Sequence, residues 1–186
     1  MKRAFDFTAA ALGLLVLAIP AALVWLVVKT TSKGPALYWS ARVGRDNALF
    51  QMPKFRTMTV GTPALATHKL EKAESYLTPP GALLRRLSLD EIPQLWCILK
   101  GDMSLVGPRP ALFNQDDLIA LRTERGVHKL TPGLTGWAQI NGRDELSIAE
   151  KVSLDAEYLQ RRSFLFDLKI LLLTIPKVLG MHGVAH

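Results

Sequence analysis

The sequence predicts an α+β fold that is mainly helical, with an N-terminal membrane helix, a small β-hairpin and amphipathic helices. Three observations support this prediction: a long uncharged run near the N-terminus, two short aromatic segments on either side of a turn sequence, and apolar residues at helical spacing in much of the remaining chain. Because 186 residues are too few for two independent folds, we expect a membrane element over residues 1–30 and one domain over residues 31–186.

The membrane element is predicted from the 22 residues between Phe7 and Val28, none of which is charged. At about 1.5 Å per residue, a continuous helix of this length would cross roughly 30 Å of hydrocarbon. A cleaved signal peptide is the less favoured alternative, because the run exceeds a usual signal-peptide core and no clear small-residue cleavage site precedes Trp25.

Basic residues flank this run on both sides. They are Lys2 and Arg3 before it, and Lys29, Lys33, Arg42, Arg45, Lys54 and Arg56 after it, with Asp46 as the one acid among the latter. By the positive-inside rule, both ends should lie in the cytoplasm. Pro20 removes a backbone donor within the run and predicts a bend there. These residues alone favour equally a re-entrant helix, which enters and leaves by one face, and a spanning helix.

A small hairpin is expected from two apolar segments, Ala36–Ser40 and Leu49–Met52, because the residues between them include the turn sequence Gly44–Asn47. The next segment, Thr59–Gly81, mixes glycine, proline and charged residues. It predicts a surface excursion that contains one short helix.

Helical spacing of leucines follows over Ala82–Leu99, where Pro93 should stand near a helix start. Ser147 and Glu150 form a capping-box pattern that predicts the start of another helix. The last apolar stretch, Phe164–Met181, is interrupted by charged residues and is too short to span a membrane. It predicts either an amphipathic helix in the membrane interface or an ordinary core helix.

Composition restricts the partners. A net charge of +7 and a pI near 9.8 indicate an anionic partner, which could be nucleic acid, an acidic lipid surface or a phosphorylated small molecule. The single cysteine, Cys97, excludes an internal disulfide and is expected to be a small buried apolar residue. The four histidines show no zinc-ligand spacing.

The strongest candidate for chemistry is a pair of adjacent acids, Asp90 and Glu91, near Arg85 at an apparent helix start. Helix capping alone is the simpler explanation, with Ser88 and Glu91 as a capping box and acids that favour the helix dipole. Cations elsewhere favour a phosphate site instead. These are Lys54 and Arg56 upstream and Arg109 downstream.

Two blocks, Lys100–Pro110 and Thr131–Arg143, combine tight-turn residues with charge. Their glycines would let the backbone approach a ligand closely, although each block alone is also explained by plain loop geometry. The chain contains no Walker-type phosphate loop, dinucleotide fingerprint or serine-nucleophile elbow.

Five motifs follow one another along the chain. They are Lys54–Met58, Ser88–Glu91, Gly101–Ser104, Gly107–Pro110 and Pro132–Trp137. In this order they closely resemble the bacterial sugar transferase family, the monotopic polyprenyl-phosphate phosphoglycosyl transferases that start exopolysaccharide, capsule, O-antigen and some glycoprotein glycans. The resemblance extends from Lys2 to His186, and without a preceding multi-span region it indicates the short, core-only form of the family.

The resemblance implies a two-step reaction in which Asp90 attacks the sugar-linked phosphate of a UDP-sugar, expels UMP and forms a phosphosugar-aspartate. Undecaprenyl phosphate then attacks that ester. Mg²⁺ is the implied cofactor, since a hard cation must help to neutralise the pyrophosphate. Asp90 and Glu91 are its candidate ligands, and Glu91 is expected to hold the metal or to organise the site.

Further site residues are implied by the same motifs. The expected phosphate or substrate ligands are Arg85, Arg109, Lys54, Arg56, Gly107 and Pro108. The resemblance also makes the Pro20 segment re-entrant. It places the catalytic domain on the cytoplasmic face of the bacterial inner membrane, in contact with phospholipid.

Resemblance of Ala111–Asp117 and Ala66–His68 to particular family branches suggests an N-acetylated amino sugar, while a homodimer is left open. Two departures, cysteine at Cys97 where asparagine is expected and Pro79–Ala82 in place of a more basic segment, could alter substrate preference or helix packing. A nucleic-acid-binding module is disfavoured, because the cations lie beside an apolar membrane run. A catalytically inactive, membrane-attached scaffold of the same pathway is the alternative function.

Overall fold

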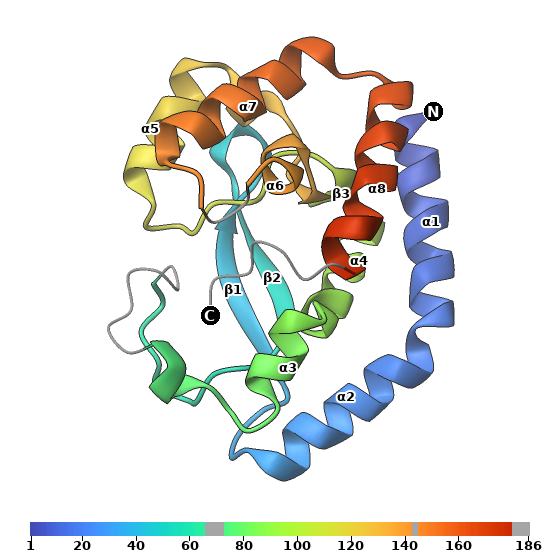
Figure 1. Cartoon of the computed structure of the whole chain (residues 1–186), viewed down its shortest axis with the longest axis vertical. Coiled ribbons are helices and arrows are strands. Elements are labelled where there is room, and N and C mark those ends of the chain that lie inside the picture. The colour runs from blue at the N-terminus through green and yellow to red at the C-terminus, as the bar shows by residue number, and fades with distance from the viewer. Residues whose placement is uncertain (66–72, 143–144, 180–186) are drawn as a thin grey trace.

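The computed structural model describes residues 1–65, 73–142 and 145–179. Helices surround a central two-stranded hairpin, so the predicted mainly helical α+β class is confirmed. A bent helix pair runs along one flank, and short helices lie between it and the hairpin (Figure 1). Three further helices, α5 (Asp116–Glu124), α6 (Trp137–Ile140) and α7 (Ile148–Arg161), gather at one end.

The bent pair consists of α1 (Lys2–Val16) and α2 (Ala18–Thr31), whose axes differ by 61°. The break lies at Leu17, in the turn that precedes Pro20, which confirms the bend that this proline predicted. The Pro20 ring clashes with the carbonyl group four residues earlier, in the last turn of α1, and proline cannot donate a hydrogen bond to it. Among the described helices, none is alone long and apolar enough to cross a membrane, but α1 and α2 together meet that requirement by length and composition.

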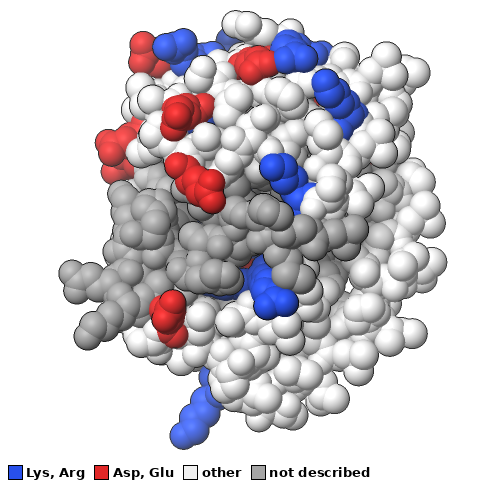
Figure 2. Space-filling view, viewed as in Figure 1, with Lys and Arg blue, Asp and Glu red and all other residues white. Residues whose placement is uncertain are grey.

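The two helices bury a narrow face and expose a wide apolar one. Ala10, Val24 and Val28 pack against the rest of the chain. The exposed apolar side chains are Phe7, Leu12, Leu15, Val16, Ile19, Leu23, Trp25, Leu26 and Val27. Few charged residues interrupt the flank over these helices in Figure 2. An apolar surface of this extent is typical of an interaction site rather than of a water-facing surface.

The predicted hairpin is confirmed. Strands β1 (Leu37–Val43) and β2 (Leu49–Phe55) pair antiparallel, with Leu37 opposite Phe55 and Val43 opposite Leu49. The turn η1 (Arg45–Asn47) joins them, and Asp46 and Asn47 have positive φ angles of 54° and 59°. Aspartate and asparagine tolerate this left-handed conformation better than other side chains do, which is why this turn sequence closes the hairpin.

The segment with helical leucine spacing is divided into three short helices. They are α3 (Gly81–Arg86), η4 (Leu89–Gln94) and α4 (Leu95–Lys100), and η3 (Ala73–Tyr76) precedes them. Ser88 has a left-handed φ of 54° and separates α3 from η4. Pro93 lies just before α4, near a helix start as expected. Cys97 is 1% exposed, which confirms the prediction of a buried residue.

A second, parallel pair of strands links the remaining helices. Strand β3 (Ser104–Val106) pairs with β4 (Gly133–Thr135), and around them lie α5 (Asp116–Glu124), η5 (Val127–Lys129) and α6 (Trp137–Ile140). The predicted capping box opens α7 (Ile148–Arg161), since Ser147 Oγ accepts from Glu150 N and the Glu150 carboxylate accepts from Ser147 N.

The last helix, α8 (Phe164–Leu179), runs beside α1 (Figure 1). Its buried side includes Phe166 and Ile170, and the Phe164 ring meets Phe5 of α1 edge to face at 5.3 Å. Leu165 and Leu172 remain exposed on another side. The helix therefore contributes to the core, as the prediction of a core helix requires. It also presents an exposed apolar surface, which the prediction of an interfacial amphipathic helix requires.

Candidate functional site

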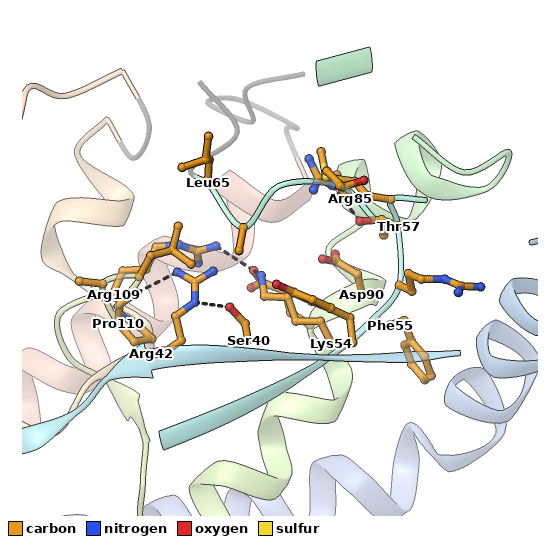
Figure 3. Close-up of a pocket in the computed structure, with 18 of the residues that line it drawn as sticks. Ser40, Arg42, Lys54, Phe55, Thr57, Leu65, Arg85, Asp90, Arg109 and Pro110 are labelled. Atoms are coloured by element: carbon orange, nitrogen blue, oxygen red, sulfur yellow. Dashed lines mark hydrogen bonds and ion pairs between the residues drawn. The ribbon is translucent and has the colours of Figure 1, made fainter. Parts of the chain in front are cut away.

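A cavity of about 450 Å³ opens above the hairpin. Its walls come from β1, β2, the segment after β2, η4 and the loop before α5 (Figure 3). Six of the residues predicted for the site line it: Lys54, Arg56, Arg85, Asp90, Glu91 and Arg109. Gly107 and Pro108 are not among its lining residues.

The hairpin supplies the floor. Tyr38, Ser40 and Arg42 alternate along β1 and therefore share one face of the hairpin. Lys54 of β2 pairs with Tyr38 and lies on the same face. All four side chains line the cavity. Arg42 Nε donates to Ser40 Oγ at 3.0 Å, so the guanidinium is held against the floor (Figure 3).

The two acids enter from η4 with different partners. Glu91 Oε1 accepts one hydrogen bond from Lys54 Nζ and one from Arg109 Nη2, each at 2.9 Å. Ser88, in the left-handed conformation, makes no side-chain cap to the helix. The capping-box explanation for Ser88 and Glu91 is therefore wrong, because Glu91 instead joins a strand and a loop that are distant in sequence.

Asp90 is 6% exposed and lies between Lys54 and Arg85 in Figure 3. Burial raises the pKa of this carboxyl above its ordinary value, and nearby Lys54 opposes the shift. Burial likewise lowers the pKa of Lys54, while Glu91 works in the opposite direction. A poorly solvated carboxylate among cations is a competent nucleophile toward a phosphate, because the cations attract the anion that it must attack.

The remaining predicted cations differ in orientation. Arg85, in the last turn of α3, donates from Nε to Thr57 Oγ1 at 2.9 Å and faces the cavity (Figure 3). Arg56 instead directs Nη2 to Ser32 Oγ at 2.8 Å and to the Ser32 carbonyl at 3.1 Å. Its guanidinium therefore contacts the end of α2 rather than the acids.

Three successive carbonyl groups of the loop that carries Arg109 accept hydrogen bonds from three different parts of the chain. The Pro108 carbonyl accepts from Gly133 N at 2.9 Å, the Arg109 carbonyl from Arg122 Nη1 at 2.8 Å, and the Pro110 carbonyl from Arg42 Nη1 at 3.2 Å. Gly107 packs so tightly that a side-chain carbon there would lie 2.4 Å from the Thr131 carbonyl oxygen. Gly107 and Pro108 thus shape the loop from behind the cavity.

Arg42 and Arg122 also line the cavity, although sequence reasoning did not assign them to it. Burial, followed by repulsion from Arg109, lowers the pKa of Arg42 to about 10. The available signal for Arg42 was the alternation of the hairpin, since residues 38, 40 and 42 share a face with Lys54. Arg122 had no local signal, because its contacts join segments that are far apart in sequence.

Among the described residues there is no group of three or more histidine, cysteine, aspartate or glutamate side chains that could hold a metal. Two carboxylates, Asp90 and Glu91, nevertheless line one cavity. Mg²⁺ commonly binds through one or two carboxylates together with substrate phosphates and water. The residues present therefore fit a metal that is shared with a phosphorylated substrate, and not a metal held by protein alone.

Comparison with known proteins is consistent with this chemistry. The family model described as bacterial sugar transferase matches residues 1–181. The chain is 43% identical over 186 residues to Uncharacterized sugar transferase EpsL of Bacillus subtilis, covering 99% of this chain and 90% of that protein.

Two other relatives carry names that state an activity. Undecaprenyl-phosphate glucose phosphotransferase of Komagataeibacter xylinus is 43% identical over 187 residues, covering 95% of this chain and 35% of that protein. UDP-glucose:undecaprenyl-phosphate glucose-1-phosphate transferase of Escherichia coli is 39% identical over 184 residues, covering 95% of this chain and 40% of that protein. The chain thus spans well under half of each of these two proteins.

Proposed function

The chain belongs to the bacterial sugar transferase family, and we propose that it transfers a sugar 1-phosphate from a UDP-sugar to undecaprenyl phosphate. The names of the relatives support both substrates. The reaction would be the first membrane step of exopolysaccharide, capsule or related glycoconjugate synthesis. The observation that carries the proposal is a single cavity in which the buried Asp90 and the Glu91 ion pairs are surrounded by arginine and lysine side chains.

In the first step, an Asp90 oxygen attacks the sugar-linked phosphorus and the bond from that phosphorus to the UMP oxygen breaks. The products are UMP and a phosphosugar-aspartate. In the second step, an oxygen of undecaprenyl phosphate attacks the same phosphorus and Asp90 leaves as a carboxylate. Arg85 and Arg109 would neutralise charge on the phosphates, since guanidinium groups match phosphate oxygens in geometry.

Glu91 has a different proposed role from Asp90. Its Oε1 holds both Lys54 and Arg109, so it fixes two cations at defined positions next to the nucleophile. With each of these three side chains at least two-thirds buried, the contacts are weakly screened by solvent. Removal of Glu91 would leave Lys54 and Arg109 without this acceptor, and the two cations would then attract Asp90.

Mg²⁺ would be held by the carboxylates of Asp90 and Glu91 together with the pyrophosphate of the donor. Bound there, the ion would neutralise charge on the phosphate oxygens. Lys54 and Arg109 already engage Glu91, so the metal contact would have to coexist with these ion pairs. Titration with Mg²⁺ during UMP release tests this requirement, and full activity in excess chelator would remove the metal from the proposal.

We assign the sugar to the N-acetylated amino sugars, on the resemblance of Ala111–Asp117 to such branches of the family. Ala111 and Leu112 line the cavity, whereas Ala66–His68, which suggested the same sugars, lies outside the described residues. The names of the Komagataeibacter xylinus and Escherichia coli relatives specify glucose. A panel of UDP-sugars that includes UDP-glucose therefore decides this point, and preference for UDP-glucose would overturn the assignment.

The proposed location is the cytoplasmic face of the bacterial inner membrane, with α1 and α2 inserted as a re-entrant pair. Their exposed apolar side chains would contact phospholipid, and the 61° bend supports entry and exit by one face. Basic residues at both ends, Lys2 and Lys33 among them, support the same topology. The acceptor phosphate would then reach the cavity from the membrane side.

UMP release from UDP-sugars, measured with purified protein in detergent or nanodiscs with and without undecaprenyl phosphate, tests the proposed function. A burst of UMP without acceptor and continuous release with acceptor are the expected results. No release with any sugar of the panel would favour the inactive scaffold. Saturable binding of single-stranded nucleic acid that ignores phospholipid and Asp90 would favour a nucleic-acid module instead.

A further inference from the structure

A buried ion pair joins α5 to α7 beside the cavity. Arg122 donates to Asp155 Oδ2 from Nε at 2.9 Å and from Nη2 at 2.6 Å. The two side chains are 12% and 2% exposed, so both are shielded from water. A pair this deeply buried carries a large desolvation cost, and an apolar pair of similar volume could fill the same space. Packing alone therefore does not explain why charged side chains occupy these positions.

The same guanidinium has a third contact that leads to the site. Arg122 Nη1 donates to the main-chain carbonyl of Arg109 at 2.8 Å. One edge of the planar group is thus fixed by Asp155, and the remaining nitrogen is aimed at the loop. Since the guanidinium is rigid, the position of Asp155 on α7 determines where the Arg109 carbonyl is held.

Arg109 is consequently fixed at both ends. Its side chain donates to Glu91 Oε1 at 2.9 Å, and its main chain is held by Arg122. The flanking prolines, Pro108 and Pro110, restrict the backbone between these two points. A shift of the carbonyl would therefore turn the side chain away from Glu91 and from any phosphate that it binds.

We propose that Arg122 and Asp155 are positioning residues that orient Arg109 toward the phosphates of the nucleotide sugar. This inference rests on the proposed function, in which Arg109 binds those phosphates. Neither residue needs to touch the substrate for this role. Displacement of a catalytic or binding group by about 1 Å can lower the rate by as much as about 100-fold, which is why an ion pair that does not contact the reacting atoms can control turnover.

Two variants separate positioning from folding. Arg122→Lys keeps one charge but cannot donate to Asp155 and to the Arg109 carbonyl in the same fork geometry. The double variant Arg122→Met/Asp155→Leu removes both charges together, so no unpaired charge stays buried and the fold is expected to persist. Arg125→Gln is the matched control, because Arg125 is an exposed cation just after α5.

The measurements are KM and kcat for the UDP-sugar in UMP release, together with thermal unfolding and crystal structures of the wild type and the double variant. We expect both variants to raise KM at least about fivefold and to lower kcat/KM by about 10- to 100-fold, while Arg125→Gln behaves as the wild type. Combination of Arg122→Lys with Arg109→Lys should cost little more than Arg109→Lys alone, because both changes act through one guanidinium. In the crystal, Arg109 should no longer lie within hydrogen-bond distance of Glu91.

A folded double variant with unchanged KM, or a kcat loss with unchanged KM that merely follows lower stability, would overturn the positioning role. Fully additive effects of the Arg122 and Arg109 substitutions would also overturn it, since they would indicate independent contributions. If the wild-type protein released no UMP, the proposed function would fail, and the Arg109–Glu91 separation in the two crystal structures would still decide whether the ion pair orients Arg109.

Discussion

Replacement of Asp90 by asparagine separates covalent catalysis from a structural role of this residue. Asparagine keeps nearly the same shape but has no carboxylate nucleophile. Asp90 is buried, and Lys54, Glu91, Arg85 and Arg109 all influence its ionisation. The substitution therefore changes one charge in the cavity while the surrounding side chains can remain in place.

The expected change in stability is small because two effects oppose each other. Burial raises the pKa of Asp90, so the folded protein disfavours the charged form, and a neutral side chain avoids that penalty at pH 7. Asparagine also loses the attraction between the carboxylate and Lys54. We expect the free energy of unfolding to change by no more than about 1 kcal/mol.

The expected loss of activity is far larger. Removal of a covalent nucleophile should lower kcat by at least about 10³-fold, which corresponds to about 4 kcal/mol in the activation barrier. The assay is UMP release, with thermal unfolding and membrane retention measured on the same samples. Asp46→Asn is the matched control, because Asp46 is exposed in the hairpin turn and asparagine accepts its positive φ.

Mass spectrometry of wild-type protein given UDP-sugar without acceptor should find a phosphosugar adduct on Asp90, absent from Asp90→Asn. Turnover by Asp90→Asn close to that of the wild type would refute the covalent mechanism. Loss of turnover together with a lower unfolding temperature would show that the carboxylate is structural.

Three further predictions concern the cations and the membrane pair. Arg109→Lys should lower kcat/KM by an amount equal to about 1–3 kcal/mol with little change in unfolding temperature, because lysine keeps the charge but loses the fork; unchanged kinetics would remove Arg109 from the site. The plot of kcat/KM against pH should be bell-shaped. On the acid side, the Asp90 carboxylate is protonated as the pH falls through its pKa, which is raised above 3.8. On the basic side, the Lys54 cation is lost as the pH rises through its pKa, which is lowered below 10.5. An acid limb centred below pH 3.8 or a basic limb centred above pH 10.5 would contradict this prediction. In a Cys97→Ala background, Ala4→Cys and Lys33→Cys should react equally with an impermeant thiol reagent, and Pro20→Ala should shift the protein toward a spanning helix; opposite-side labelling without Pro20→Ala would contradict the re-entrant topology.

The features that the sequence predicted correctly depend on local chemistry. The hairpin follows from alternating apolar strands around a turn whose residues tolerate positive φ at Asp46 and Asn47. The start of α7 follows from the reciprocal hydrogen bonds of Ser147 and Glu150, which involve only four successive residues. Such signals act over a few residues and do not require knowledge of the tertiary fold.

The same local rule failed at Ser88 and Glu91, although the pattern of the two residues is identical to that at Ser147 and Glu150. Ser88 adopts a left-handed conformation, and the Glu91 carboxylate bonds to Lys54 and Arg109 instead. Two charged donors offer a carboxylate stronger hydrogen bonds than one backbone N–H group does. These partners are 37 and 18 residues away in sequence, so no local pattern could reveal them.

The N-terminal charges indicate membrane topology, and they also have specific partners in the fold. Lys2 Nζ donates to Asp167 at 2.5 Å and to the Val106 carbonyl at 3.1 Å, and Asp6 accepts from Ser104 Oγ at 2.7 Å. These contacts hold β3, the strand that leads directly into the Arg109 loop. At the other end of the membrane pair, Arg56 bonds to Ser32 and belongs to the segment that follows Lys54. Both ends of the pair are therefore attached to segments that deliver a cation to the cavity, and a change in its insertion would be expected to alter the site as well as membrane affinity.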